Sequence, residues 1–204
     1  MVIKTRIAFL FALVLTSMHS QAQTLSLKDL DTARVYTSVD AAMANPLNVL
    51  RLDLSKQKML TLPQEVFELT NLQELKLNKC RLSELPNSFR LLPNLQILQC
   101  QHNDITTIPP SVFQLKQLKT LDLADNIIEI IPDEIDQLGE LETLAMWDNP
   151  VTYYPEVLSE MQQLKVLDVL NNAISRETQQ RLKSALPGCK IIMSPPCSCM
   201  DGDE

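Results

Sequence analysis

One stretch of this chain decides its fold: Leu72-Gln-Glu-Leu75-Lys-Leu77-Asn-Lys-Cys80-Arg-Leu82-Ser-Glu-Leu85-Pro86-Asn-Ser-Phe89-Arg-Leu-Leu92. The same pattern recurs every 23 residues. Two series of equivalent positions show the repeat: Val49, Leu72, Leu95, Leu118, Leu141 and Leu164, and Pro63, Pro86, Pro109, Pro132 and Pro155. A repeat of this length and leucine spacing predicts a solenoid, in which each copy is one coil stacked on its neighbours.

Each repeat begins with an alternation of apolar and polar residues. Leu75 and Leu77 are separated by Lys76, which is the period of a strand with one buried face. Equivalent pairs recur at Leu98/Cys100, Leu121/Leu123, Leu144/Met146 and Leu167/Val169. The second half of each repeat supplies further apolar pairs, from Val66/Leu69 to Leu158/Met161. We therefore expect a parallel sheet on one side of the solenoid and a core closed from the other side.

An asparagine follows the strand in four repeats, at Asn103, Asn126, Asn149 and Asn172. The chain turns away from the sheet there, so backbone groups inside the coil need partners. A carboxamide donates two hydrogen bonds and accepts two, so a column of asparagines can satisfy these groups. Gln57 and Cys80 replace Asn in the first two repeats, where we expect a weaker column.

These features resemble the leucine-rich repeat family, most closely its 23-residue type with Leu-x-x-Leu-Pro-x-x-Phe after the asparagine. The resemblance covers about residues 47–188 and extends to secreted bacterial members through the segment Val35-Tyr-Thr-Ser-Val-Asp-Ala-Ala-Met-Ala-Asn-Pro46. It implies an α/β horseshoe-shaped solenoid with a parallel concave β-sheet, an irregular convex side and helical caps at both ends. It also implies a binding module with no catalytic residues to transfer.

The first 22 residues have the layout of a secretory signal. Lys4 and Arg6 precede an apolar run over residues 7–15, and Ser20-Gln21-Ala22 presents small residues to a signal peptidase. The run is too short to cross a hydrocarbon core of about 30 Å. We expect cleavage after Ala22, export to the periplasm, cell surface or medium, and no membrane insertion after signal removal.

The remaining chain divides into four expected parts. Residues 23–48 form an N-terminal cap, in which Ser38 begins a short helix that ends near Ala44. About six repeats occupy residues 49–174. Residues 175–193 form a C-terminal cap, with a helix from Ser175 to about Ala185 and a last short strand. Residues 194–204 are an acidic tail.

The net charge of the chain limits the class of partner that it can bind. Loss of residues 1–22 removes two basic residues and no acidic one, leaving 16 basic and 25 acidic residues and a net charge of −9. Such a chain is repelled by phosphate backbones, so nucleic acid is excluded as a partner.

Cys80 and Cys100 occupy interior positions and are expected to be buried. Cys189 could pair with Cys197 or Cys199, and the odd count leaves at least one thiol unpaired or joined to another molecule.

Outward-facing strand positions form three columns across the predicted sheet. They are Arg51, Glu74, Ile97, Thr120, Thr143 and Val166; Asp53, Lys76, Gln99, Asp122, Ala145 and Asp168; and Ser55, Asn78, Gln101, Ala124, Trp147 and Leu170. Basic residues gather over the first two repeats, namely Arg51, Lys56, Lys58, Lys76, Lys79 and Arg81. Because Glu74 and Asp53 interleave with them, we expect a solvated face there.

Trp147 is the only tryptophan and is expected to point outward between Ala124 and Leu170. It is either a binding anchor or a ring that packs over Leu170 and shields the sheet. Acidic residues around it favour a partner with an apolar knob surrounded by basic groups. The candidate partner-binding residues are Trp147, Leu170, Val166, Ala145, Asp122, Asp168, Thr143 and Ile97.

No catalytic, cofactor or metal site is predicted. Cys100 is expected inside the core and His102 on the turn, so they do not form a nucleophile–base pair. The chain is expected to be a monomeric, non-catalytic exported module that binds a protein through its concave face. Two alternatives remain open: a self-assembling or adhesive surface protein, and an intracellular signalling scaffold if the N-terminal segment is not a signal.

Overall fold

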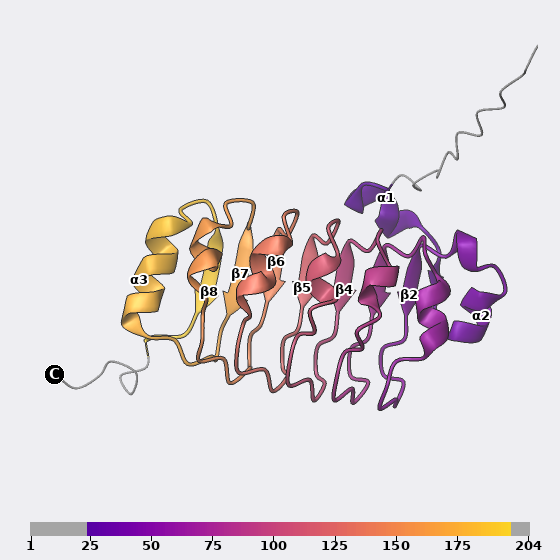
Figure 1. Cartoon of the computed structure of the whole chain (residues 1–204), viewed down its shortest axis with the longest axis horizontal. Coiled ribbons are helices and arrows are strands. Elements are labelled where there is room, and N and C mark those ends of the chain that lie inside the picture. The colour runs from indigo at the N-terminus through magenta and orange to yellow at the C-terminus, as the bar shows by residue number, and fades with distance from the viewer. Residues whose placement is uncertain (1–23, 197–204) are drawn as a thin grey trace, which may run out of the picture.

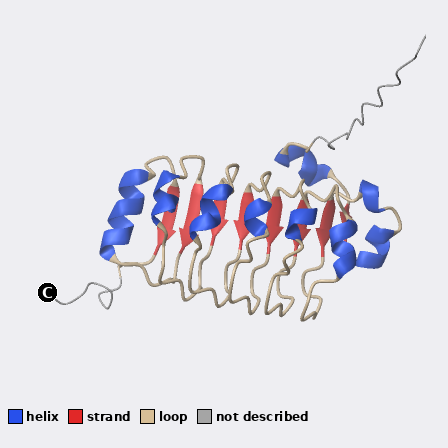
Figure 2. Cartoon of the chain, in the orientation of Figure 1, coloured by secondary structure: helices blue, strands red, loops and turns tan. Residues whose placement is uncertain are grey.

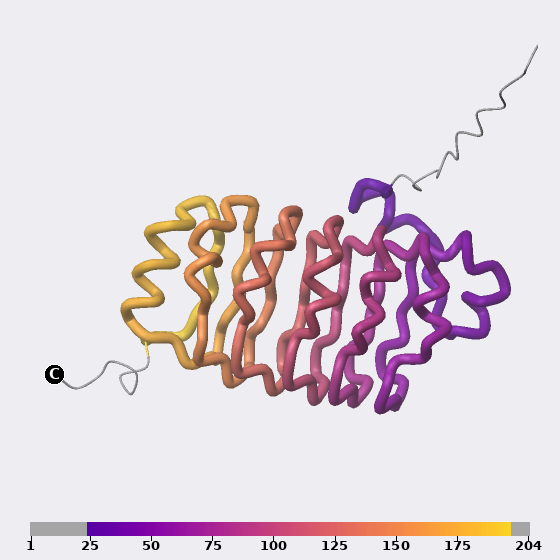
Figure 3. The backbone as a smooth tube through the Cα atoms, in the orientation of Figure 1, coloured from indigo at the N-terminus to yellow at the C-terminus, as the bar shows by residue number. Residues whose placement is uncertain are grey.

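The computed structural model describes residues 24–196, so the predicted signal segment, Cys197 and Cys199 lie outside the described residues. The described part is one row of stacked coils, which the tube in Figure 3 follows from the N-terminal to the C-terminal end. Strands form one face of the row, and short helices lie on the other (Figure 2). The predicted α/β solenoid is confirmed.

The strands of the described residues make one parallel sheet in the order β1 to β8 (Figure 1). They are β1 (Val35–Tyr36), β2 (Arg51–Asp53), β3 (Glu74–Lys76), β4 (Ile97–Gln99), β5 (Thr120–Asp122), β6 (Thr143–Ala145), β7 (Val166–Val169) and β8 (Lys190–Met193). From β2 to β7 each residue pairs with the one 23 positions later, as in Leu75 with Leu98. The repeat length is therefore the register of the sheet. β1 adds a strand from the cap that the repeat pattern does not contain.

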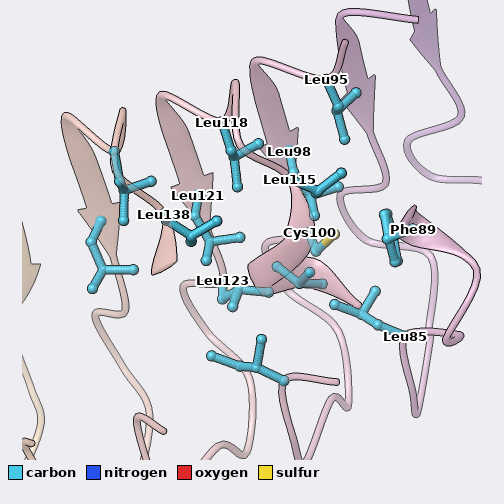
Figure 4. Packing of buried hydrophobic residues seen from close by; sticks show 14 of the residues in the cluster. Leu85, Phe89, Leu95, Leu98, Cys100, Leu115, Leu118, Leu121, Leu123 and Leu138 are labelled. Atoms are coloured by element: carbon cyan, nitrogen blue, oxygen red, sulfur yellow. The ribbon is translucent and has the colours of Figure 1, made fainter. Parts of the chain in front are cut away.

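The opposite face carries 3₁₀ helices, one from each of the first five repeats. They are η2 (Gln64–Glu68), η3 (Phe89–Leu91), η4 (Val112–Gln114), η5 (Asp133–Gln137) and η6 (Glu156–Glu160). Leucines from both halves of the coil meet in one continuous core, which also contains Phe89 and Cys100 (Figure 4). No coil can bury its leucines alone, so stability depends on the interfaces between neighbours.

Helical caps close both ends of the row. The N-terminal cap contains α1 (Leu27–Thr32), α2 (Val39–Met43) and η1 (Pro46–Asn48). Ser38 caps α2 as predicted, since its hydroxyl accepts from the Ala41 amide. The C-terminal cap is α3 (Arg176–Ala185), begun by Ser175 as predicted. α1 was not predicted, because its Ser26 cap and six residues carry no repeat signature.

The asparagines form the expected column inside the turn that follows each strand. Asn126 donates to the carbonyls of Cys100, Leu123 and Ala124 at 2.9–3.1 Å, and its oxygen accepts from the Ile105 amide at 3.0 Å. The amide nitrogens of Asn103, Asn149 and Asn172 likewise reach a carbonyl 26 residues earlier, at Leu77, Leu123 and Met146. Each asparagine thus joins its own coil to the preceding one.

The first two repeats continue this column with other side chains. The Cys80 thiol donates to the Leu54 carbonyl at 3.2 Å, which is the acceptor an asparagine would use. Gln57 donates to the Thr37 carbonyl at 2.8 Å and so joins the first repeat to the cap. The thiol also lies 3.6 Å from the Asn78 carbonyl, but neither side chain donates to three carbonyls as Asn126 does, in agreement with the weaker column expected there.

Replacing Asn126 by Ala should lower the free energy of unfolding by about 3 kcal/mol, because it leaves several buried backbone groups unpaired. Urea denaturation followed by circular dichroism measures the change. Asn87→Ala, at an exposed position before η3, is the matched control and should change stability by less than about 0.5 kcal/mol. Equal effects of the two substitutions would contradict the structural role of the column.

Candidate functional site

Trp147 lies just after β6, and its side chain is partly exposed at the C-terminal half of the strand face. Its ring meets the ring of His102 edge to face, with centroids 5.8 Å apart and planes at 78°. The His102 Nδ1 atom is hydrogen bonded to the Asp125 carboxylate. The tryptophan is therefore held from the side by residues of two preceding coils. His102 was expected on the turn, but the repeat pattern carries no signal for its contact with Trp147.

Next to Trp147, a small side chain lies between two carboxylates. Strand register places Ala145 of β6 directly beside Asp122 of β5 and Asp168 of β7. Neighbouring strands are about 4.8 Å apart, so the methyl side chain of Ala145 has one carboxylate-bearing residue on each side. This arrangement can receive one positively charged side chain.

The two carboxylates have different surroundings. Asp122 is only 7% exposed; it accepts a hydrogen bond from the Gln101 amide group and another from the Ala124 amide at 3.3 Å. Burial raises the pKa of Asp122, and the nearby charge of Asp168 acts in the same direction. Asp168 is less buried and accepts from the Leu170 amide at 3.1 Å. A cation above Ala145 would relieve the cost of keeping Asp122 ionised.

The remaining candidate residues fall into two groups. Thr143 and Val166 are register neighbours in β6 and β7, and Leu170 is 38% exposed just after β7, so all three belong to the Trp147 region. Ile97 does not. It lines a separate hollow of about 380 Å³ beneath α1, together with Leu27 and Leu30.

One neighbour expected beside Trp147 is absent from the surface. Ala124 was expected to point outward, but it is completely buried. The repeat pattern assigns an outward direction to this position, but it carries no information on the residues that cover it. Ala124 can therefore contribute nothing to a binding surface.

The cap covers the start of the first strands of the repeats, at Arg51 and Glu74. Arg51 donates to the Asp31 carbonyl at 2.6 Å and forms an ion pair with Glu74, and both side chains are more than 90% buried. Glu74 also lies 2.9 Å from the Lys76 ammonium. The solvated basic face expected here is therefore wrong for Arg51, which holds α1 against β2 and β3.

The segment before α1 is attached to the same region through two glutamines. The Leu25 amide donates to the side-chain oxygen of Gln73 at 2.9 Å, and Gln96 donates to the Leu25 carbonyl at 2.9 Å. Both glutamines are buried. Together with the Arg51 contacts, they fix the cap over the start of strands β2 to β4, whereas Asp53, Lys76 and Gln99 further along these strands stay partly exposed.

Burial at Glu74 acts against ionisation, but the hydrogen bonds from Arg51 and Lys76, with their charges, outweigh it. The pKa of Glu74 is therefore lowered from its ordinary value of 4.5. A carboxyl group of this kind stabilises the fold fully above its unfolded pKa. That contribution is lost as the pH falls through the lower pKa of the folded state.

Cys80 and Cys100 are buried, as predicted, and both are free thiols. Burial raises the pKa of Cys100 well above its ordinary value, so this thiol is a poor nucleophile. Among residues 24–196, no cluster of three or more His, Cys, Asp or Glu side chains is arranged to hold a metal ion. Within the same range no helix is both long and apolar enough to cross a membrane.

A family model for the leucine-rich repeat region matches residues 46–192, so the chain belongs to the leucine-rich repeat family. Members of this family are typically non-catalytic and act as protein-interaction modules. No curated protein is similar to the chain at the level of sequence.

Two solved structures show how far the likeness extends. A leucine-rich repeat protein of Leptospira interrogans is 26% identical with a TM-score of 0.66, over 80% of this chain and 49% of its own. Internalin C2 of Listeria monocytogenes is 21% identical with a TM-score of 0.65, over 74% and 63% of the two chains. The chain therefore spans about half of the first and less than two thirds of the second, and the second likeness concerns the fold alone.

Replacing Arg51 by Met should lower the free energy of unfolding by about 3 kcal/mol, since Glu74 would remain buried without its main partner. The double variant Arg51→Met/Glu74→Met should recover most of this loss. In the wild type, protonation of Glu74 below about pH 4.5 removes part of the free energy of unfolding. The double variant has no carboxyl group at this position and should not show that loss. Urea titrations at neutral and acid pH measure both effects. A double variant no more stable than the single one would refute the pairing.

Proposed function

We propose that this chain is an exported leucine-rich repeat module that binds a protein partner through the C-terminal half of its strand face. The binding patch consists of Trp147, Leu170, Val166, Ala145, Asp122, Asp168 and Thr143. Ile97, which the sequence placed in the same set, is left out because it borders α1 instead.

The observation that carries this proposal is the pairing of a braced aromatic ring with two acidic side chains. Trp147 rests against His102, and Ala145 lies between Asp122 and Asp168. Aromatic anchors beside small residues are typical of the energetic centres of protein interfaces. The fold itself does not require Asp122, because an uncharged side chain would avoid the cost of its burial.

The chemistry of the patch defines the partner. An apolar group would contact Trp147 and Leu170, and a lysine or arginine side chain would enter above Ala145 between the two carboxylates. A cation there gains from both carboxylate charges. The partner is therefore a protein surface with an apolar residue next to a basic one.

Trp147→Ala should reduce capture of the partner at least about tenfold while the domain remains folded, because an aromatic anchor contributes about 1.4 kcal/mol or more. The experiment immobilises the protein, exposes it to cell-surface extract and quantifies the captured proteins by mass spectrometry. Leu91→Ala is the matched control, since Leu91 is 47% exposed on the helical face in η3.

A partner retained equally by wild type and Trp147→Ala would rule out the patch. Capture through the patch should also weaken at high salt, because the expected contact includes a charge pair. Asp168→Asn tests this contribution separately from the tryptophan.

The proposed export can be tested at the N-terminus of the mature protein. The protein recovered outside the cytoplasm should begin at Gln23, as expected from cleavage after Ala22. N-terminal sequencing of the recovered protein decides this directly. A chain recovered only from the cytoplasm and still carrying residues 1–22 would contradict export and favour an intracellular scaffold.

A further inference from the structure

A second surface lies along the edge of the solenoid where the strands end. Each chain turn there passes through a residue with positive φ, at Lys56, Lys79, His102, Asp125, Asp148 and Asn171, and the turn of Lys79 has a second at Arg81, with φ between 50° and 68°. The residues that follow each turn continue this edge toward the helical face. We call this strip the turn edge; it is the lower border of the molecule in Figure 3.

The N-terminal end of the turn edge is basic. Lys56, Lys58, Lys79 and Arg81 are exposed, and none of them makes an ion pair within residues 24–196. Leu60 stands among them with 73% of its surface exposed, the highest value of any large apolar residue described. Glu84 is the acidic exception at this end.

The C-terminal end of the turn edge is acidic and apolar. A groove of about 700 Å³ is lined by residues that include Ile127, Ile130 and Pro150. Ile127 and Ile130 are 49% and 54% exposed, and Tyr153 beside them is 46% exposed. The acidic residues of this end are Asp104, Asp125, Glu129 and Asp148.

The two ends occupy equivalent positions of the repeat. Ile127 and Pro150 stand three and four repeats after Lys58, and Glu129 stands three repeats after Leu60. A segment with exposed lysines and a leucine is thus complementary in charge and polarity to a groove with isoleucines and acidic residues. Both lie on the same edge of one rigid row of coils.

From this complementarity we propose that two copies of the chain associate side by side and antiparallel through their turn edges. Each basic end with Leu60 then lies on the acidic groove of the other copy. A two-fold axis lets both contacts form at once, and such an interface closes on itself. This assembly goes beyond the proposed partner binding, uses different residues, and replaces the monomer expected from sequence.

Charge also argues against the chain's own tail as the occupant of the groove. Residues 197–204 include Asp201, Asp203 and Glu204 and no basic residue. Such a segment would be repelled by Glu129 and Asp104. The basic end of a second copy has the required sign and carries the exposed apolar side chain.

Two reciprocal variants test this arrangement. The first, Lys56→Glu/Lys58→Glu, removes the excess positive charge of the basic end; the second, Asp104→Lys/Glu129→Lys, removes the excess negative charge of the acidic end. Each should dimerise at least about tenfold more weakly than wild type, because opposite charges then no longer face each other at either contact. An equimolar mixture should form a one-to-one dimer more readily than either variant alone, since the unaltered acidic end of the first variant then meets the unaltered basic end of the second.

Sedimentation equilibrium of the full chain and its variants measures these constants. Wild-type dimerisation should weaken between about 0.1 M and about 1 M salt, as the screening length falls from about 10 Å to about 3 Å. Lys28→Glu/Lys183→Glu is the control for the first variant, with the same change in net charge away from the turn edge, and it should dimerise like the wild type. Ile130→Asp should weaken the dimer without changing charge at the basic end.

Three results would overturn the proposal: a wild-type protein that stays monomeric at every concentration, variants that dimerise like the wild type, or a mixture that stays monomeric. Failure of this assembly leaves the Trp147 patch untouched, because none of these variants alters it. Conversely, Trp147→Ala should leave the dimerisation constant unchanged.

Discussion

The structure depends on one constraint: every coil must satisfy its backbone through its neighbour. The sheet pairs each strand residue with the one 23 positions later, and the asparagine column joins the turns in the same register. An insertion of one residue in any repeat would turn the leucines of the next strand outward and separate Asn126 from the Cys100 carbonyl. The exact spacing along the chain is therefore required by hydrogen bonding as well as by packing.

The repeat made most of the fold predictable. Because equivalent positions have equivalent surroundings, the burial of Leu75 implies the burial of Leu98 and Leu121, and the role of Asn126 implies that of Asn149. Even Cys80 follows this logic, since its thiol reaches the carbonyl that an asparagine would reach. Ser38 and Ser175 were recognised as helix starts from local capping chemistry alone.

The errors arose where residues outside the repeat act on residues inside it. Arg51 and Glu74 occupy outward positions, but α1 covers them, and the 23-residue repeat does not predict α1. Ile97 was separated from Trp147 for the same reason. The contact of His102 with Trp147 spans two coils and depends on the orientation of the two rings. The assignment of residues to outward-facing positions does not specify that orientation.

The N-terminal cap and the distribution of charged residues give the molecule surfaces that differ in exposure and charge. α1 covers Arg51 and Glu74 at the N-terminal end of the strand face, and the Trp147 patch lies at the C-terminal end. The turn edge carries a basic end and an acidic end, so its charges are separated along the axis of the solenoid. Because the core and the asparagine column hold the coils rigidly, these exposed residues can change without loss of the fold.

Native-state hydrogen exchange tests the central constraint most directly. The amides of Ile105 and Ile128 donate only to side-chain oxygens of the column, at Asn126 and Asn149. If these contacts bind the coils together, both amides should exchange only through opening of neighbouring coils, with protection close to that of the core strands. Exchange of Ile105 and Ile128 as fast as that of the exposed Lys58 amide would contradict the account.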